Sequence, residues 1–303
     1  MDFIDLHAHS TASDGTMTPA ELVEHAVHLS RIKLAALALT DHDTVDGVEE
    51  ALQAAKGTSL KLIPGTELSC YYQVPFTEEE QALLGTGAQL HQKSVELHIL
   101  GLFVDYKNKN FLDALQELKQ ARYIRNLKMI ALFEKDGIPM SMDKLTQGKP
   151  DTVITRAHFA RVLMEEGIVS GKEQAFKKYL GPGCKYYLPK PEVTPEHVLS
   201  LIRQAGGIPI LAHPLIYKLG YRQIEVLIET LIPLGLQGIE AYHSSNNRYE
   251  SDRLRSMALK YNLVVSGGSD FHGANKPDIE LGIGRGGLRI TEHILHQIEA
   301  LRP

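Results

Sequence analysis

Short apolar runs recur along the chain, and longer stretches with a helical spacing of apolar residues lie between them. The short runs predict buried strands, and the longer stretches predict amphipathic helices. One helix is predicted at 19–30, with Thr18 as its N-cap and Pro19 at its first position. The runs with strand character are 3–6, 34–39, 60–63, 97–104, 208–212, 237–241 and 263–266.

This alternation is typical of βα units around a parallel sheet, and six or seven units suit a closed or nearly closed barrel. The rhythm stops between about 108 and 191, where helices are predicted at 110–135, 155–166 and 172–180 without a buried strand. We therefore expect three parts: residues 1–107 as the first part of the barrel, 108–191 as an inserted helical subdomain that caps the substrate, and 192–303 as the second part of the barrel. A second interruption at 71–94 predicts a long loop or hairpin.

Composition and charge narrow the functional classes. The formal net charge of −5 gives no sign of an extended nucleic-acid surface. No apolar run approaches the roughly 20 residues that span a bilayer, so we expect no membrane segment. The chain has two cysteines, Cys70 and Cys184, outside any Cys-x-x-Cys pair, and no signal peptide is visible, so a cytoplasmic location is expected.

Potential metal ligands follow or lie within most of the predicted strands. Because a parallel barrel gathers the C-terminal ends of its strands on one face, they are expected to converge there. A single histidine is more often a hydrogen-bonded polar residue, but six histidines and three acids in such positions indicate metal binding. Imidazole with carboxylate suits Zn, Mn or Fe, and nine ligands suit two or three ions, with Glu67 placed to bridge. The nine are His7, His9, Asp14, His42, Glu67, His98, His213, Asp270 and His272.

Their motifs resemble the PHP (polymerase and histidinol phosphatase) family. These are His7-Ala8-His9, Asp14, Thr40-Asp41-His42-Asp43, Gly65-Thr66-Glu67, His98, Ala212-His213-Pro214 and Ser269-Asp270-Phe271-His272. The resemblance covers about residues 1–106 and 192–290 and implies a distorted (β/α)7 TIM-like barrel with three metal ions. It implies one ion at His7, His9, Glu67 and Asp270, a second at Glu67, His98 and His213, and a third at Asp14, His42 and His272.

The helical insertion resembles that of the nucleoside 3′,5′-bisphosphate phosphatases and related 5′→3′ exoribonucleases. Arg122, Arg125 and Asn126 share one face of the helix predicted at 110–135. That face is either a solvated basic surface or a phosphate clamp, and the subfamily has a similar Arg-x-x-Arg-Asn segment that contacts phosphate. Arg156 and His158 are a second candidate pair. For His243, phosphate contact, protonation of the leaving group and a structural role stay open.

We therefore expect a metal-dependent phosphoesterase in which a metal-bound hydroxide attacks a phosphomonoester. His243 is a candidate to assist this step. The favoured substrate is a small phosphorylated nucleotide, cleaved at the 3′-phosphate of a nucleoside 3′,5′-bisphosphate, with Mn as the first choice of metal and Zn, Fe or Mg as alternatives. Exonuclease action on short 5′-phosphorylated RNA and histidinol-phosphate cleavage are the alternatives. A metal-dependent amidohydrolase is a weaker reading, and a non-catalytic PHP scaffold is the weakest.

Overall fold

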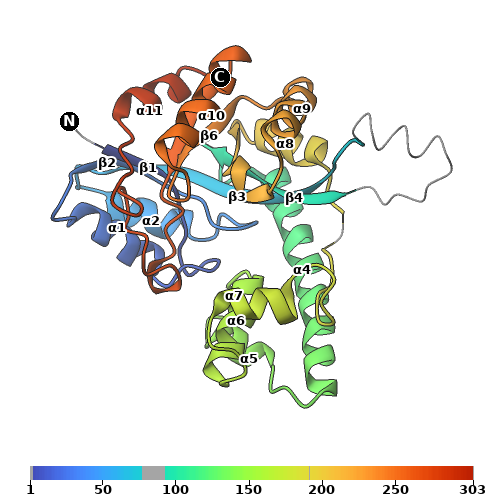
Figure 1. Cartoon of the computed structure of the whole chain (residues 1–303). Coiled ribbons are helices and arrows are strands. Elements are labelled where there is room, and N and C mark those ends of the chain that lie inside the picture. The colour runs from blue at the N-terminus through green and yellow to red at the C-terminus, as the bar shows by residue number, and fades with distance from the viewer. Residues whose placement is uncertain (1–2, 77–92, 191, 303) are drawn as a thin grey trace, which may run out of the picture.

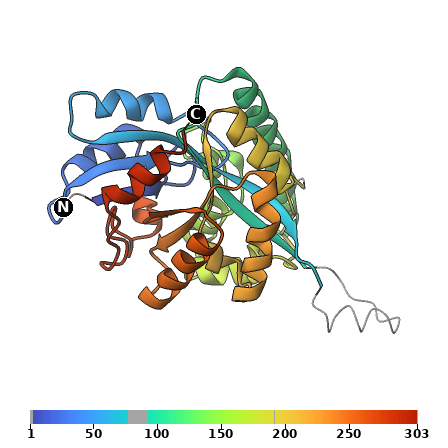
Figure 2. The ribbon, with the colours of Figure 1, turned by 90° about the horizontal axis from the view of Figure 1, so that it is seen from above.

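The computed structural model describes residues 3–76, 93–190 and 192–302. Seven strands form one sheet in the order β1 to β7, and the sheet curves into a nearly closed barrel (Figures 1 and 2). Each expected strand is present. The strands are β1 (Phe3–Ala8), β2 (Leu34–Leu39), β3 (Lys61–Gln73), β4 (Ser94–Leu102), β5 (Ile208–Leu211), β6 (Gly238–His243) and β7 (Val264–Gly268).

The expectation of a wholly parallel sheet is wrong for one strand. β4 pairs antiparallel with both β3 and β5, whereas the other neighbouring pairs are parallel. The reason is the connection at 74–93, which turns β3 directly back into β4 as a hairpin, whereas parallel neighbours need a crossover. The segment expected as a loop or hairpin at 71–94 begins and ends in paired strands, β3 and β4, as a hairpin does. Residues 77–92 lie outside the described residues.

The barrel nearly closes where β1 meets the segment that follows β7. The backbone N–H of Asp270 donates to the carbonyl of His7, and that of His9 donates to the carbonyl of Phe271, both at 2.9 Å. Gly268 makes this approach possible, because a Cβ atom there would lie 2.3 Å from the Cβ of His7. The first and last strands of the chain are therefore neighbours.

Helices cover the outer face of the sheet, and their apolar sides form the largest core cluster with it. α1 illustrates the local logic: Thr18 and Glu21 form a reciprocal capping box, and Leu22, Val23 and Ala26 are buried. A second apolar cluster on the other face of the sheet is covered by α11. The covering elements are α1 (Pro19–Val27), α2 (Val48–Ala55), α8 (Pro195–Gln204), η2 (Pro214–Tyr217), α9 (Tyr221–Leu231), η3 (Ile232–Leu234), α10 (Arg248–Lys260), η4 (Gly273–Asn275) and α11 (Glu292–Glu299).

The inserted helices form a lobe beside the barrel, and α4 runs from one to the other (Figure 1). This lobe has an apolar cluster of its own, which includes Met129, Phe133 and Phe159. The separate cluster supports the expected three-part division, which stays a prediction. The helices are α4 (Lys109–Lys135), α5 (Met142–Thr146), α6 (Arg156–Glu165), α7 (Lys172–Ala175) and the single-turn π-helix η1 (Phe176–Leu180).

Two further expectations concern cysteines and membranes. Cys70 and Cys184 are both free thiols. Among the residues described, no helix is both long enough and apolar enough to cross a membrane.

Candidate metal centre

The first two candidate ligands come from β1 and the residue just beyond it. His7 and His9 are fully buried, and their Nε2 atoms lie 3.1 Å apart, so both imidazoles point to the same side. His7 Nδ1 lies 2.9 Å from Glu240 Oε1. Burial disfavours protonation of His7, but the carboxylates of Glu240, Glu67 and Asp270 outweigh it and raise the pKa of this imidazole well above its usual value. Burial and the neighbouring His272 lower the pKa of His9.

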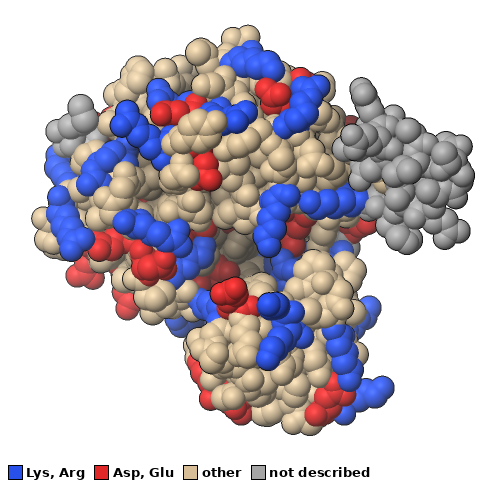
Figure 3. Space-filling model, in the orientation of Figure 1, with Lys and Arg blue, Asp and Glu red and all other residues tan. Residues whose placement is uncertain are grey.

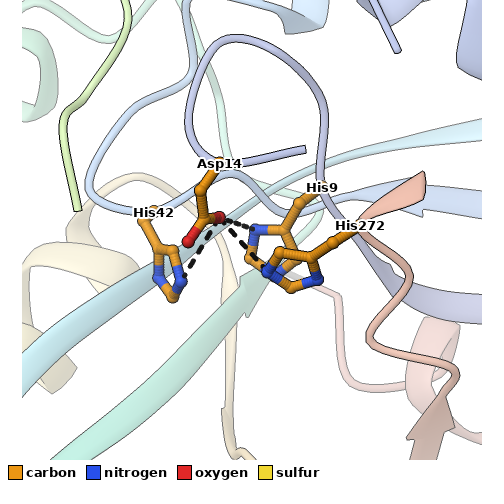
Figure 4. Close-up of side chains that lie close together, drawn as sticks. All are labelled: His9, Asp14, His42 and His272. Carbon is orange, nitrogen blue, oxygen red and sulfur yellow. Dashed lines mark ion pairs between the residues drawn. The ribbon is translucent and has the colours of Figure 1, made fainter. Parts of the chain in front are cut away.

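Asp14 is the centre of a second group, drawn in Figure 4. Its Oδ1 atom lies 3.2 Å from His272 Nε2, 3.8 Å from His42 Nε2 and 3.9 Å from His9 Nδ1. Burial raises the pKa of Asp14, but the surrounding imidazoles of His42 and His272 bring it well below the usual range. Oδ1 is buried and accepts no hydrogen bond from any described residue, whereas Oδ2 accepts one from Thr155. A buried carboxylate oxygen that faces three imidazoles fits a divalent ion.

Glu67 lies between the two groups. Its Oε1 atom is 2.8 Å from His98 Nδ1 and 2.9 Å from His213 Nε2. Its Oε2 atom is 3.0 Å from His42 Nδ1 and 3.3 Å from His9 Nε2. One carboxylate thus faces imidazoles from four segments of the chain, which is the geometry expected of a bridging ligand.

The nine candidate ligands all meet in this region, although His98 arrives from the middle of the antiparallel strand β4. Asp270 follows β7 with a φ of 57°, and its Oδ1 lies 3.5 Å from His9 Nε2. Four overlapping sets have ligand atoms within 4.8 Å of one another: His9, Asp14, His42 and His272; His7, Glu67 and His213; His7, His9 and Asp270; and His42, Glu67 and His98. The expected grouping is close to these sets, but it shares only Glu67 between two ions, whereas His7, His9, His42 and Glu67 each belong to two sets.

Three buried carboxylates that were not among the candidates hold the ligand-bearing segments in place. Asp41 accepts hydrogen bonds from Ser10 and Ser13, and Asp5 accepts from the backbone of Ser269 and Gly282. Glu240 joins His7 to the backbone N–H of His213, at 2.7 Å. These three residues could have been found in the sequence as acids inside or just after an apolar strand. A carboxylate buried at such a position needs hydrogen-bond or ion-pair partners.

The candidate ligands open into a cavity of about 260 Å³ between the barrel and the helical lobe. Of the six candidate substrate residues, Arg122 and Arg156 line it. Arg122 is 5% exposed and pairs with Asp43, and burial together with the neighbouring Arg125 lowers its pKa to about 9. Arg156 donates to Glu96 at 2.9 Å.

Three other candidates have partners within the fold. Arg125 donates from Nε to the carbonyl of Leu188 and from Nη1 to Asn126 Oδ1, both at 3.0 Å. Asn126 donates to the carbonyl of Ile154 at 3.1 Å. His158 accepts the backbone N–H of Thr155 as part of a helix cap, and burial lowers its pKa to about 4. None of these three is a wall residue of this cavity, and their contact with substrate stays a prediction.

His243 lies at the end of β6 and is 2% exposed. Its Nδ1 accepts the backbone N–H of Ser245 at 3.1 Å, and its Nε2 lies 3.3 Å from Asp270 Oδ2. Because Nδ1 is an acceptor, the neutral ring carries its proton on Nε2, towards Asp270. This places a proton donor beside the candidate ligands.

Sequence reasoning missed three lysines and one acid in the cavity wall. Glu96 of β4 pairs with Lys190 as well as with Arg156. Burial and the nearby Arg122 lower the pKa of Lys190 to about 7. Lys172 and Lys276 also line the cavity. The Pro189-Lys190-Pro191 segment identified a boundary, but nothing in its pattern indicated that the lysine side chain would turn into the cavity.

Comparison with known proteins decides the family. The sequence model of the PHP domain matches residues 5–179, more than half of the chain. The chain belongs to the PHP domain family. The motif resemblance is therefore confirmed.

Among curated relatives, a 5'-3' exoribonuclease of Haemophilus influenzae is 35% identical over 268 residues, which are 88% of this chain and 89% of that protein. A 3',5'-nucleoside bisphosphate phosphatase of Chromobacterium violaceum is 32% identical over 304 residues, with coverage of 99% and 98%. These are the two activities of the expected subfamily.

Among solved structures, a protein described as a metal-dependent phosphoesterase of Bifidobacterium adolescentis has a TM-score of 0.79 at 29% identity, over 99% of this chain and 96% of that one. An amidohydrolase of Chromobacterium violaceum with bound sulfate and no metal has a TM-score of 0.80 at 31% identity, over 99% and 98%. Together with the curated relatives, these findings confirm the expected enzyme class: this PHP protein is a metal-dependent phosphoesterase.

Proposed function

We propose that the protein removes the 3′-phosphate from a nucleoside 3′,5′-bisphosphate, using two or three divalent ions. One observation carries the proposal: candidate metal ligands and buried cations line the same cavity, among them Asp14, His42, Arg122 and Arg156. A substrate with a phosphate at each end of one nucleoside needs both. Mn is the metal expected first, and Zn, Fe and Mg remain alternatives.

The four ligand sets support an assignment of residues to ions. His7, His9 and Asp270 would hold one ion, Glu67 with His98 and His213 a second, and Asp14, His42 and His272 a third. Glu67 would bridge, because both of its oxygens face imidazoles. When bound, divalent ions lower the pKa of water and neutralise charge on the phosphate oxygens.

The reaction is an in-line hydrolysis. A water oxygen forms a bond to the phosphorus, the bond between phosphorus and O3′ breaks, and O3′ leaves as a hydroxyl after taking up a proton. The proton that O3′ takes up balances the one that the attacking water loses, and His243 would assist by donating a hydrogen bond from Nε2–H, which lies beside Asp270. The protein needs no nucleophilic side chain for this step.

The second phosphate, at the 5′ position, would bind to Arg156, Lys190 and Arg122. Arg156 and Lys190 are held at the wall by Glu96, which carries a single negative charge. A phosphate monoester carries up to two and accepts bidentate hydrogen bonds from a guanidinium. Arg125 and Asn126 would help indirectly, because their hydrogen bonds fix α4 against the segments that bear Ile154 and Leu188.

A 5′→3′ exonuclease acting on short RNA is the second candidate, because the matched relatives include a 5'-3' exoribonuclease. Such an RNA presents the same 5′-phosphorylated nucleotide, with a phosphodiester at O3′ in place of the monoester. Histidinol phosphate is a weaker candidate, since its single phosphate would leave Arg156 and Lys190 without a phosphate to bind. We also propose that residues 108–191 act as a cap over the site and that the protein works in the cytoplasm.

The test is phosphate release by the Mn-loaded protein from adenosine 3′,5′-bisphosphate, AMP and histidinol phosphate. We expect a strong preference for the bisphosphate, and a KM for it that rises in Arg156→Met. Arg248→Met is the matched control, because Arg248 is 97% exposed. Equal, weak activity on all three compounds, unaffected by Arg156→Met, would sink the nucleotide assignment. Alanine at His9 or Asp270 should abolish turnover on every substrate.

A further inference from the structure

Two pairs of cations line the cavity, and each pair contacts a different part of the barrel. Arg156 and Lys190 stand at β4, where both contact Glu96. Lys172 and Lys276 stand at the segment that follows β7. β5 and β6 separate these strands in the sheet, and candidate metal ligands line the same cavity as both pairs of cations. Lys and Arg side chains are visible on both sides of the hollow between barrel and lobe in Figure 3.

Lys172 is the first residue of α7 and reaches from the helical lobe across to the barrel. Its Nζ donates to the backbone carbonyl of Asn275 and lies 3.4 Å from the side-chain oxygen of the same residue. Among the described residues, no carboxylate oxygen lies within 4 Å of this ammonium group, so its partners are neutral. Burial lowers the pKa of Lys172, the more distant carboxylate of Asp14 opposes this shift, and the neighbouring Lys276 adds to it. A half-buried ammonium without a carboxylate in direct contact is costly, and an anionic ligand would offset that cost.

The pair of Lys172 and Lys276 adjoins the candidate metal ligands directly. Asn275 donates from Nδ2 to the carbonyl of Asp14 at 2.8 Å, and Lys276 pairs with Asp270 Oδ2 at 2.5 Å. An anion held by Lys172 and Lys276 would therefore lie next to a phosphate at the metal centre.

A nucleoside bisphosphate accounts for only one of the two pairs of cations. One of its phosphates would occupy the metal centre and the other would bind Arg156 and Lys190, which leaves Lys172 and Lys276 without a phosphate. We propose that Lys172 and Lys276 bind the next phosphate of a short 5′-phosphorylated oligoribonucleotide, one nucleotide beyond the bond that is cut. The proposal rests on the proposed function, since it uses the same site and the same 5′-phosphate subsite.

The chemistry is unchanged for this substrate. Water adds to the phosphorus of the first phosphodiester and the bond to O3′ breaks. One product is a nucleoside 5′-monophosphate with a free 3′-hydroxyl. The other is a shortened RNA that carries a new 5′-phosphate, so it can enter the site again.

The experiment compares two substrates that differ only in the phosphate in question: 5′-phosphorylated diadenylate with and without a 3′-terminal phosphate. The readout is the initial rate at which each dinucleotide is consumed, because one cut releases two AMP from the substrate without the 3′-terminal phosphate and only one AMP from the other. In the wild type, the additional phosphate should raise kcat/KM, and in Lys172→Met this advantage should fall about fivefold, as for loss of one partly exposed charged contact to phosphate. Lys172→Arg should retain it. Lys178→Met is the matched control, because Lys178 is exposed on the following turn.

The outcomes separate this proposal from the proposed function. If the wild type hydrolyses adenosine 3′,5′-bisphosphate but gains nothing from the third phosphate, the subsite is overturned and the proposed function stands. An equal loss on both dinucleotides in Lys172→Met also overturns the subsite, since it indicates a structural role. Absence of activity on the bisphosphate and on both dinucleotides would overturn both. A melting curve for each variant checks that the fold is intact.

Discussion

Glu240 offers the sharpest test of how the metal centre is built. The side chain is fully buried, and its two oxygens accept from His7 Nδ1 at 2.9 Å and from the backbone N–H of His213 at 2.7 Å. Because the Glu240 carboxylate accepts a hydrogen bond from Nδ1, the proton of His7 stays on Nδ1. The lone pair of Nε2 is then free and faces His9, Glu67 and Asp270. Glu240→Gln keeps the volume of the side chain but replaces one acceptor with an amide donor.

The consequence follows from the hydrogen-bond geometry. If the amide oxygen keeps the bond to His213, the NH2 group faces His7, and the imidazole must turn its Nδ1 lone pair towards it. The proton of a neutral His7 then moves to Nε2, which blocks the atom that would bind the metal. Loss of such an outer partner weakens metal affinity by about 10-fold to 100-fold, or roughly 1.4 to 2.7 kcal/mol.

The assay is a titration of the metal-free protein with Mn, followed by direct binding and by activity. We expect the weakest bound ion to require a concentration 10-fold to 100-fold higher in Glu240→Gln, with kcat recovering at saturating metal. Glu24→Gln is the control, because Glu24 is exposed. Unchanged affinity in a folded Glu240→Gln variant would refute the role of Glu240 in setting the tautomer of His7.

Three further predictions follow from the same geometry. Burial lowers the pKa of Lys190 to about 7, so its ammonium group loses its charge as the pH rises through 7. We expect kcat/KM for the bisphosphate to fall in that pH range, and Lys190→Arg should remove the fall from the pH profile. Arg125→Ala should lower the free energy of unfolding by about 1 to 3 kcal/mol in denaturant titrations, because the carbonyl of Leu188 and Asn126 each lose a partner, and it should raise KM less than Arg156→Met does. Chelation should stop turnover and lower the melting temperature, and Mn should restore both. Metal present at 100 times its dissociation constant stabilises the fold by about 2.7 kcal/mol. A melting temperature that does not change with metal would contradict the assignment of the buried ligands.

The sequence predicted the barrel and the candidate ligands from features that are local in the chain. Each strand was visible as an apolar run, and the pair His7 and His9 was placed on one side by the two-residue period of a strand. Helix α4 was expected at 110–135 and spans Lys109–Lys135, because its apolar residues repeat with a helical period. His28, His197, His293 and His296, which lie in stretches with a helical pattern, are exposed.

The direction of β4 and the partners of the cavity residues could not be predicted in this way. An apolar run reads the same in both directions, so the pattern of 97–104 does not distinguish a parallel from an antiparallel strand. Arg125 and Arg156 look alike in the sequence, yet one hydrogen-bonds inside the lobe and the other faces the cavity. Glu96, Lys172 and Lys190 lack any motif, because their roles come from segments that meet only after folding.

The sequence by itself thus determined which residues can bind metal and which elements carry them, since ligand chemistry and strand or helix periodicity are properties of neighbouring positions. Only the tertiary structure decided how these residues are shared. Glu67 faces His98, His213 and His42, which are 31, 146 and 25 residues away from it, because the curved sheet brings their segments together. It also decided which cations line the cavity, because Lys172 and Arg156 come from the helical lobe and Lys276 from the barrel.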